Sequence, residues 1–198
     1  MIWLLYGVGI GLTREHLTLE AIKVIEKVDE VIVPGKMAYE IVKDIREPRV
    51  VEFPMGKSEE VVKNLAKEIA RRANEEIAFC CIGDPVFYST FRHLVEELRR
   101  IKLDAEIMIV PGISSISAAM ALTETFISNS AIISTPNFDE AEVAVILKVK
   151  NPMDVERKLR DMGFREFFLL ERMFMDGEVF YDEMPEKSSY FSVLVARR

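Results

Sequence analysis

Three glycine-containing turns hold most of the residues in this sequence that could bind a ligand or take part in chemistry. They are residues 7–11, 83–91 and 111–115. Each turn follows a short apolar run of strand length, and ligands of open α/β folds bind beyond the carboxyl ends of strands. A single site would require the three turns to converge in space, and the sequence does not give the strand order that decides this.

The first turn, Gly7-Val8-Gly9-Ile10-Gly11, departs from two nucleotide-binding motifs. A dinucleotide-binding GxGxxG motif requires a glycine where this chain has Leu12, and no acidic residue follows the second predicted strand. The P-loop signature also fails, because no Gly-Lys-Ser/Thr follows the glycines. Two interpretations stay open: a plain tight turn, or a backbone that a ligand or another segment can approach closely.

The second and third turns place polar side chains directly after apolar strands. Asp84 could cap a following helix, with Pro85 at its first position, and could also accept a hydrogen bond from a cationic or hydroxylated ligand. Ser114 and Ser115 stand at another predicted helix start, where either hydroxyl could cap. Free backbone N–H groups there could bind a carboxylate or the nitrogens of an adenine ring.

The first half of the chain alternates short apolar runs with segments of helical period, which predicts parallel strands joined by crossover helices. The expected strands are residues 2–8, 30–33, 49–52, 77–82 and 106–110, and the expected helices are residues 19–28 after an N-cap at Thr18, 39–45, 58–69 and 87–100. Beyond them we expect a helix at 114–122, strands at 131–134, 142–149, 166–171, 178–181 and 189–196, and a helix at 154–162. This predicts an α/β protein of two domains, 1–112 with a parallel sheet and 113–198 with a mixed or antiparallel sheet.

The composition excludes several classes of function. With 49% hydrophobic and 30% charged residues the chain is globular, and its net charge of -7 argues against general binding of nucleic acid. Cys80 and Cys81 should be core thiols on opposite faces of one strand, and His16 and His93 lack the neighbours of a zinc site. No apolar run reaches the ~18 residues of a membrane span. We therefore expect a cytoplasmic protein with no metal, nucleic-acid or membrane partner.

The order and spacing of the turns resemble those of the tetrapyrrole methylases, a family of S-adenosylmethionine-dependent enzymes. The shared segments are the Gly-rich first turn, Leu17-Thr18-Leu19-Glu20-Ala21, Gly83-Asp84-Pro85 and Pro111-Gly112-Ile113-Ser114-Ser115. Further segments resemble the branch that methylates C20 of precorrin-2 or cobalt-factor II in cobalamin (vitamin B12) biosynthesis: Phe53-Pro54-Met55, Tyr88-Ser89-Thr90-Phe91 and Tyr190-Phe191-Ser192. Where the family commonly has Gly-Pro-Gly-Asp-Pro, this chain has Gly9-Ile10-Gly11-Leu12-Thr13, in a loop one residue longer.

The resemblance implies two α/β domains with the cofactor S-adenosyl-L-methionine in the cleft between them, a tetrapyrrole substrate and a homodimer. Carried over position by position, the expected cofactor contacts are Ile10, Gly83, Asp84, Phe87, Ser114, Ser115, Leu147 and Met173. The residues expected at the substrate are Tyr88, Ser89, Lys57, Arg92 and Arg172. The pigment carries many carboxylates and the protein has a net charge of -7, so the two should repel each other. The basic residues of this set would offset that repulsion where the pigment binds.

Methyl transfer from a sulfonium is a direct displacement, which needs alignment and exclusion of water rather than a protein nucleophile. This agrees with a chain that has no Ser-His-Asp or Cys-His signature, and we assign no catalytic side chain. In the resembling enzymes the nucleophile is a meso carbon of the reduced tetrapyrrole. Two alternatives stay open: a sister methylase that acts on another corrin position or, like diphthine synthase, on a protein, and a non-catalytic ligand-binding homologue.

Overall fold

A computed structural model describes residues 4–54, 58–72, 74–134, 140–181 and 183–198. Contacts between Cα atoms divide the chain into two compact units, Met1–Ser128 and Asn129–Arg198. Each unit has its own sheet and its own hydrophobic core. The protein is thus an α/β protein with one parallel and one antiparallel sheet, as the sequence pattern predicts. The domain boundary expected between residues 112 and 113 stays a prediction.

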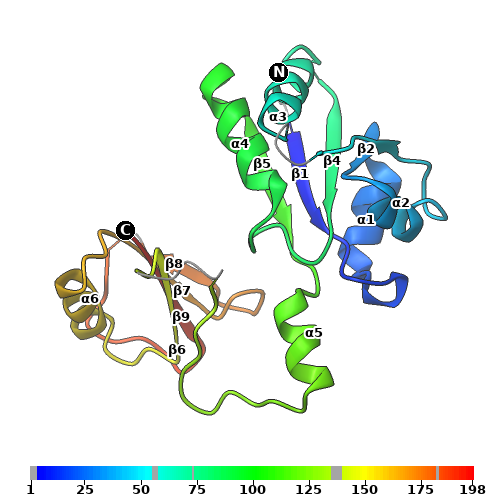
Figure 1. Ribbon diagram of the computed structural model, residues 1–198. Helices are drawn as coiled ribbons and strands as arrows, with labels where there is room; N and C mark the ends of the chain where they lie inside the picture. The colour runs from blue at the N-terminus through cyan, green and yellow to red at the C-terminus, as the bar shows by residue number, and fades with distance from the viewer. Residues whose placement is uncertain (1–3, 55–57, 73, 135–139, 182) are drawn as a thin grey trace. The chain divides into compact units, whose positions relative to one another are not determined.

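The first unit is built on a five-stranded parallel sheet with the strand order β3-β2-β4-β1-β5 (Figure 1). Its strands are β1 (Leu4–Gly9), β2 (Glu30–Val33), β3 (Arg49–Val50), β4 (Glu76–Cys81) and β5 (Glu106–Val110). All residues of β4 after the first are buried, because both faces of this central strand are covered. That explains why its sequence is a continuous apolar run rather than an alternating one.

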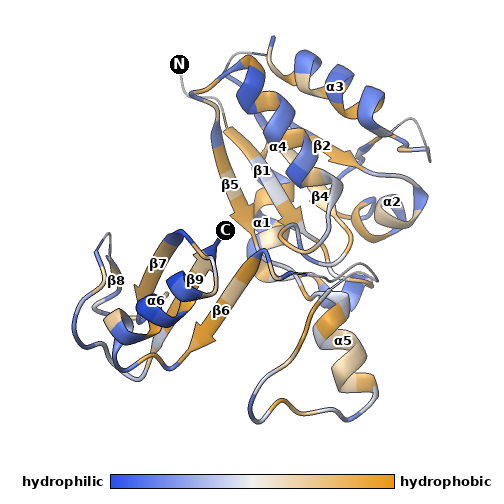
Figure 2. Ribbon diagram, turned by 60° about the vertical axis from the view of Figure 1, so that its left-hand side comes forward, coloured by the Kyte–Doolittle hydropathy of each residue, from blue (hydrophilic) through white to orange (hydrophobic). Residues whose placement is uncertain are grey.

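Two pairs of helices cover the two faces of this sheet. The helices α1 (Leu19–Lys27) and α2 (Lys36–Val42) pack on one face, and α3 (Ser58–Ile69) and α4 (Thr90–Ile101) pack on the other (Figure 1). In Figure 2, α3 and α4 carry both polar and apolar stretches, as amphipathic helices on a sheet should. Cys80 belongs to the first core and Cys81 to the second, which confirms the prediction of two buried thiols on opposite faces. Burial raises the pKa of the Cys81 thiol to about 12.

Local signals set the first two helix starts. The Thr18 hydroxyl oxygen accepts a hydrogen bond from the backbone N–H of Ala21 at 3.0 Å, so the predicted N-cap is confirmed. The second helix begins at Lys36, three residues before the expected start at residue 39. Gly35 lies at φ +100°, a conformation open to glycine, and it turns the chain into the helix directly after β2.

The fourth helix corrects two expectations about the second turn. It begins at Thr90 with Ser89 in the N-cap position, so the predicted helix start at residue 87 is wrong. Asp84 therefore does not cap this helix, and Pro85 is not its first residue. The physical reason is Tyr88, whose φ of +50° interrupts the right-handed backbone between the Asp84 turn and the helix.

The short elements around the first unit's other turns are a 3-10 helix, η1 (Arg14–His16), and α5 (Ser115–Leu122). Ser114 is the N-cap of α5, and its hydroxyl oxygen accepts a hydrogen bond from the Ser117 N–H at 3.3 Å. None of the residues of α5 is buried. Within the part of the chain that the structure describes, no helix is both long and apolar enough to cross a bilayer.

The second unit is a four-stranded antiparallel sheet with one helix. Its elements are β6 (Val143–Leu147), α6 (Pro152–Asp161), β7 (Glu166–Glu171), β8 (Val179–Tyr181) and β9 (Ser192–Arg197), and the strand order is β6-β9-β7-β8. Leu159 of α6 packs with Phe164, Leu169 and Leu194 to form the core on one face of this sheet. The strand expected at residues 131–134 is wrong: all four residues are exposed and lie outside any strand, so the apolar side chains of this run have no sheet face to cover.

A buried glycine in β1 offers a test of the packing between sheet and helix. A β-carbon on Gly7 would overlap the ring of Phe91, which is 2% exposed and stacks on Phe79. We expect Gly7→Ala to lower the free energy of unfolding by about 1–3 kcal/mol through overpacking, measured by urea denaturation. The double variant with Phe91→Leu should recover part of this loss, because the smaller side chain vacates the space. Strictly additive effects of the two substitutions would contradict the contact.

Candidate functional site

The strand order brings the three glycine-containing turns together. β1 lies between β4 and β5, and all three run in parallel. Their carboxyl ends therefore meet at one edge of the sheet, and each end continues into one of the turns. The chain also reverses its direction of winding at this place, since β2 lies on one side of β1 and β5 on the other. Such a switch point is where open α/β sheets bind ligands.

The first two turns are joined by backbone hydrogen bonds. Gly11 and Gly83 form an isolated antiparallel bridge, in which the Gly11 N–H donates to the Gly83 carbonyl at 3.1 Å and the Gly83 N–H donates to the Gly11 carbonyl at 2.8 Å. Just before it, the Ile10 N–H donates to the Cys81 carbonyl at 3.0 Å. The end of β1 is thereby fixed to the end of β4.

The third turn is held against the other two by a carboxylate. Asp84 is 8% exposed, and its Oδ2 accepts a hydrogen bond from the Gly112 N–H at 3.0 Å while its Oδ1 accepts one from the Val86 N–H at 2.9 Å. The chains are so close here that a β-carbon on Gly9 would overlap Gly112, and one on Gly112 would overlap Gly83. The glycines of the first turn therefore allow other backbone segments to approach closely. This favours the second of the two interpretations of that turn over a plain tight turn.

At Gly83 the missing side chain leaves room for a methyl-sized group in van der Waals contact with the start of α5. Its φ is +74°, which side chains rarely adopt, and a β-carbon there would lie 3.8 Å from both Ser114 Cα and Ser115 N. Ser115 is exposed as the first residue of α5, where the backbone N–H groups lack partners within the helix. Gly83, Asp84, Ser114 and Ser115, four of the expected cofactor contacts, thus lie together.

Ile10 and Phe87, the other two expected cofactor contacts of the first unit, differ in their exposure. Ile10 is fully buried in the core, and its N–H is engaged by the Cys81 carbonyl, so the structure exposes no part of this residue at the edge. Phe87 is 41% exposed in the turn after Asp84, and its N–H donates to the Asp84 carbonyl at 3.3 Å.

Three of the residues expected at the substrate line one hollow of the first unit. Tyr88, Ser89 and Arg92 lie there together with Ser58 and Glu59 at the start of α3. Arg92 Nε donates to Glu96 at 2.8 Å, so its positive charge is balanced within α4. Lys57, the fourth expected residue, lies outside the described residues.

In the second unit, the expected residues gather at one end of the antiparallel sheet. β9 lies between β6 and β7, and Val193 near its start pairs with Leu147 on one side and Leu170 on the other. Leu147 is the last residue of β6, while Arg172 and Met173 follow β7 directly. The Arg172 N–H donates to the Phe191 carbonyl at 2.7 Å, and Arg172 has a φ of +57°.

A carboxylate that the sequence reasoning missed fixes this end of the sheet. Glu171 accepts hydrogen bonds from the Ser189 N–H at 3.1 Å and the Tyr181 hydroxyl at 3.0 Å, and hydrogen bonds from these two residues lower its pKa. The loop before β9 is thereby tied to the end of β7. Nothing in the local sequence marks this contact, because its partners are 10 and 18 residues away.

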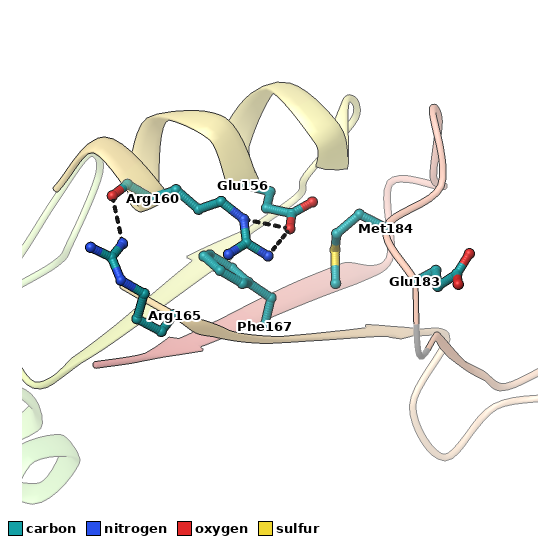
Figure 3. Close-up of a pocket in the computed structure, with 6 residues that line it drawn as sticks. All are labelled: Glu156, Arg160, Arg165, Phe167, Glu183 and Met184. Atoms are coloured by element: carbon teal, nitrogen blue, oxygen red, sulfur yellow. Dashed lines mark hydrogen bonds and ion pairs between the residues drawn. The ribbon is translucent and has the colours of Figure 1, made fainter. Parts of the chain in front are cut away.

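A hollow elsewhere in the second unit contains none of the expected residues (Figure 3). Its lining residues are Glu156, Arg160, Arg165, Phe167, Glu183 and Met184. Arg160 lies over the ring of Phe167 at 4.5 Å and pairs with Glu156 at 2.6 Å, and Arg165 donates to the Arg160 carbonyl at 3.0 Å. These charges serve the packing of α6 on the sheet.

Comparison with known proteins places the chain in a family. Residues 4–156 match the Tetrapyrrole (Corrin/Porphyrin) Methylases. A relative from Methanocaldococcus jannaschii, named a probable cobalt-precorrin-2 C(20)-methyltransferase, is 32% identical over 224 aligned residues, which cover 98% of this chain and 95% of the relative. The chain belongs to the tetrapyrrole methylase family.

Solved structures show the same fold. The precorrin-6Y methylase of Archaeoglobus fulgidus superposes with a TM-score of 0.53 at 23% identity, covering 100% of this chain and 99% of the other. The uroporphyrin-III C-methyltransferase of Thermus thermophilus, in complex with S-adenosyl homocysteine, gives a TM-score of 0.50 at 18% identity, covering 98% and 97%. Tetrapyrrole methylases use S-adenosylmethionine, and this chain is an S-adenosylmethionine-dependent methyltransferase of that family.

The Asp84 carboxylate gives a direct test of how the turns are joined. In Asp84→Asn one of the two acceptors becomes an NH2 group that faces a backbone N–H. We expect the free energy of unfolding of the first unit to fall by about 1.5–3 kcal/mol, the range for hydrogen bonds to charged groups, in urea denaturation. Asp104→Asn, at an exposed turn position, is the control and should change stability by less than about 0.5 kcal/mol. Equal stability of the two variants would show that the bridge between the turns contributes little.

Proposed function

We propose that this enzyme transfers a methyl group from S-adenosylmethionine to C20 of precorrin-2 or cobalt-factor II, as a cytoplasmic step of cobalamin biosynthesis. The observation that carries the proposal is the convergence of three turns around Gly83 and Asp84 at the switch point of the sheet. The position on the ring is supported by the full-length similarity to the Methanocaldococcus jannaschii relative. It is also supported by the Tyr88-Ser89-Thr90-Phe91 segment, part of which lines a hollow beside these turns.

The absence of a side chain at Gly83 favours close approach of the donor. A purine or an amino-acid group can approach the backbone there, because no β-carbon stands in the way. The Ser115 N–H and the Phe87 side chain are the groups that would bind and cover it, and Ile10 would come into contact only if the first turn moved, because the residue is fully buried. Asp84 uses both carboxylate oxygens on backbone N–H groups, so we assign it the role of holding the turns in place.

Two residues of the second unit complete the proposed donor contacts. Leu147 is 63% exposed at the end of β6, and Met173 is partly buried after β7. Both offer apolar surface at the same end of the antiparallel sheet. Contact with the thioether and the adenine ring is the use that we propose for them.

The pigment is proposed to contact Tyr88, Ser89, Arg92 and Arg172, together with Lys57. Tyr88 is 68% exposed at the hollow and combines an apolar ring with a polar tip, as contact with a tetrapyrrole edge requires. Arg172 is exposed and forms no ion pair among the described residues, although its charge acts on the adjacent Glu171, and we propose that it meets a pigment carboxylate. Arg92 would have to exchange Glu96 for such a carboxylate.

S-adenosylmethionine, when bound, supplies a methyl group on a positively charged sulfur that a carbon nucleophile can displace. The chain's residues contribute alignment: the three turns fix the donor, and the hollow beside α4 positions the ring. Apolar side chains such as Phe87 exclude water from the path of the methyl group.

Incubation of the pure protein with methyl-labelled S-adenosylmethionine and cobalt-factor II tests the proposal. We expect one label per ring, at C20, located by NMR of the product. Label at another ring position would identify a sister corrin methylase, and label in a polypeptide from added cell protein would identify a protein methylase. Binding of the donor without transfer would identify a non-catalytic homologue.

A pair of glycine variants provides the control for the donor site. Gly83→Ala and Gly163→Ala both place a side chain at positive φ, +74° and +98°, and so both are strained. Gly163 follows α6 in the second unit and is not among the residues proposed to contact the donor. We expect calorimetry to show donor affinity reduced at least about 10-fold in Gly83→Ala and near wild type in Gly163→Ala.

A homodimer is part of the proposal. Val143 and Val145 are 50% and 57% exposed on one face of β6, and apolar patches of this kind are typical of protein interfaces. We expect analytical ultracentrifugation to give twice the chain mass of 22.7 kDa, and Val145→Lys to shift the protein toward the monomer. A monomer at micromolar concentration would contradict this part of the proposal.

A further inference from the structure

We propose that His16 binds a carboxylate of the bound ligands through its Nε2–H, at the edge of the first turn. This inference rests on the proposed function, because it names a further contact of the same site. It follows from the tautomer that the local backbone imposes on the imidazole. The carboxylate could belong to the amino-acid part of S-adenosylmethionine or to a side chain of the pigment, and the experiment below distinguishes the two.

The position of His16 is set by Gly11. Gly11 lies at φ +67°, and the space that its β-carbon would occupy is filled by the β-carbon of His16. Gly11 is also the residue that pairs with Gly83 through two backbone hydrogen bonds. His16 therefore packs directly on the bridge that joins the first turn to the second, although it belongs to a loop one residue longer than the family commonly has.

The tautomer of His16 is set by Leu12. The Leu12 N–H donates to Nδ1 of His16 at 3.4 Å, so Nδ1 carries a lone pair rather than a proton. A neutral imidazole has one proton, and it must then be on Nε2. His16 cannot serve as a general base through Nε2 in this state. It presents an N–H donor on the edge of the ring that is turned away from Leu12.

The surrounding charges show why this donor is useful. On the same 3-10 turn, Arg14 pairs with Asp44, and Glu15 is exposed with a pKa lowered first of all by a hydrogen bond with Thr13. Asp84 has both oxygens engaged by the backbone. In the 3-10 turn that follows the first turn, His16 is thus a polar side chain with a hydrogen-bonding edge that no described contact uses.

Two substitutions of His16 separate its hydrogen bond with the Leu12 N–H, which closes the loop, from its proposed contact with the ligand. His16→Asn keeps an acceptor near the Nδ1 position for the Leu12 N–H and removes the Nε2–H. His16→Leu removes both. His93→Asn is the matched control, since His93 is an exposed side chain of α4 that faces Glu96 at 3.6 Å.

The measurement is calorimetric affinity for three probes: S-adenosylhomocysteine, its decarboxylated analogue and cobalt-factor II. If the donor's carboxylate is the partner, His16→Asn should weaken binding of S-adenosylhomocysteine by about 10-fold to 100-fold and leave the decarboxylated analogue unchanged. If a pigment carboxylate is the partner, only the affinity for cobalt-factor II should fall by that factor. Wild-type affinity of His16→Asn for all three probes would overturn the proposal and leave His16 with loop closure alone.

Nitrogen NMR of the free protein provides a readout that does not depend on activity. The 15N shifts of the imidazole should show Nε2 of His16 as the protonated ring nitrogen and Nδ1 as the acceptor of the Leu12 N–H, with His93→Asn used to assign the signals. Protonation at Nδ1 would overturn the proposal. Failure of the wild type to methylate cobalt-factor II while it still binds S-adenosylhomocysteine would instead refute the proposed function and leave this inference intact.

Discussion

The fold of the first unit depends on the close approach of three backbone turns at one edge of a parallel sheet. Gly9, Gly83 and Gly112 lie so near one another that a methyl group on the first or last of them would overlap its neighbour. The Asp84 carboxylate accepts one hydrogen bond across this contact, from the Gly112 N–H, and one within its own turn, from the Val86 N–H. Because an unpaired buried N–H is costly, a glycine-lined contact of this kind is stable only with such an acceptor.

This contact determines what the edge can bind. Side chains are excluded from its centre, so recognition there depends on backbone groups, on the start of α5 and on the few side chains that border it, such as Phe87 and His16. A ligand with a flat ring and a short polar tail suits these groups better than one that needs several charged partners. S-adenosylmethionine has that form, and the family to which the chain belongs uses it.

The charge of the protein limits how it could bind a pigment that carries carboxylates. The protein has a net charge of -7, and near the hollow its basic residues are balanced locally, Arg92 by Glu96 and Arg100 by Glu97. A pigment carboxylate would have to displace these partners, which are on exposed helix turns and contribute little to stability. In the proposed function, neutral donors and Arg172 therefore have a larger part in pigment recognition than the net charge of the protein suggests. The positive φ angles of Tyr88 and Arg172 fit this view, since strained backbone is often found where a side chain must be presented.

The sequence by itself determined the elements and the chemistry of the turns. Periodicity placed β2, β5 and β7 at their observed bounds, and alternation placed Cys80 and Cys81 in different cores, because these depend on neighbours along the chain. Tertiary structure alone decided that β1 lies between β4 and β5, that Asp84 binds Gly112 rather than capping α4, and that Glu171 binds Tyr181 and Ser189. These contacts join residues between 10 and 28 positions apart or depend on strand order. No local pattern encodes them, because the side-chain and backbone groups that form them meet only when the sheets have formed.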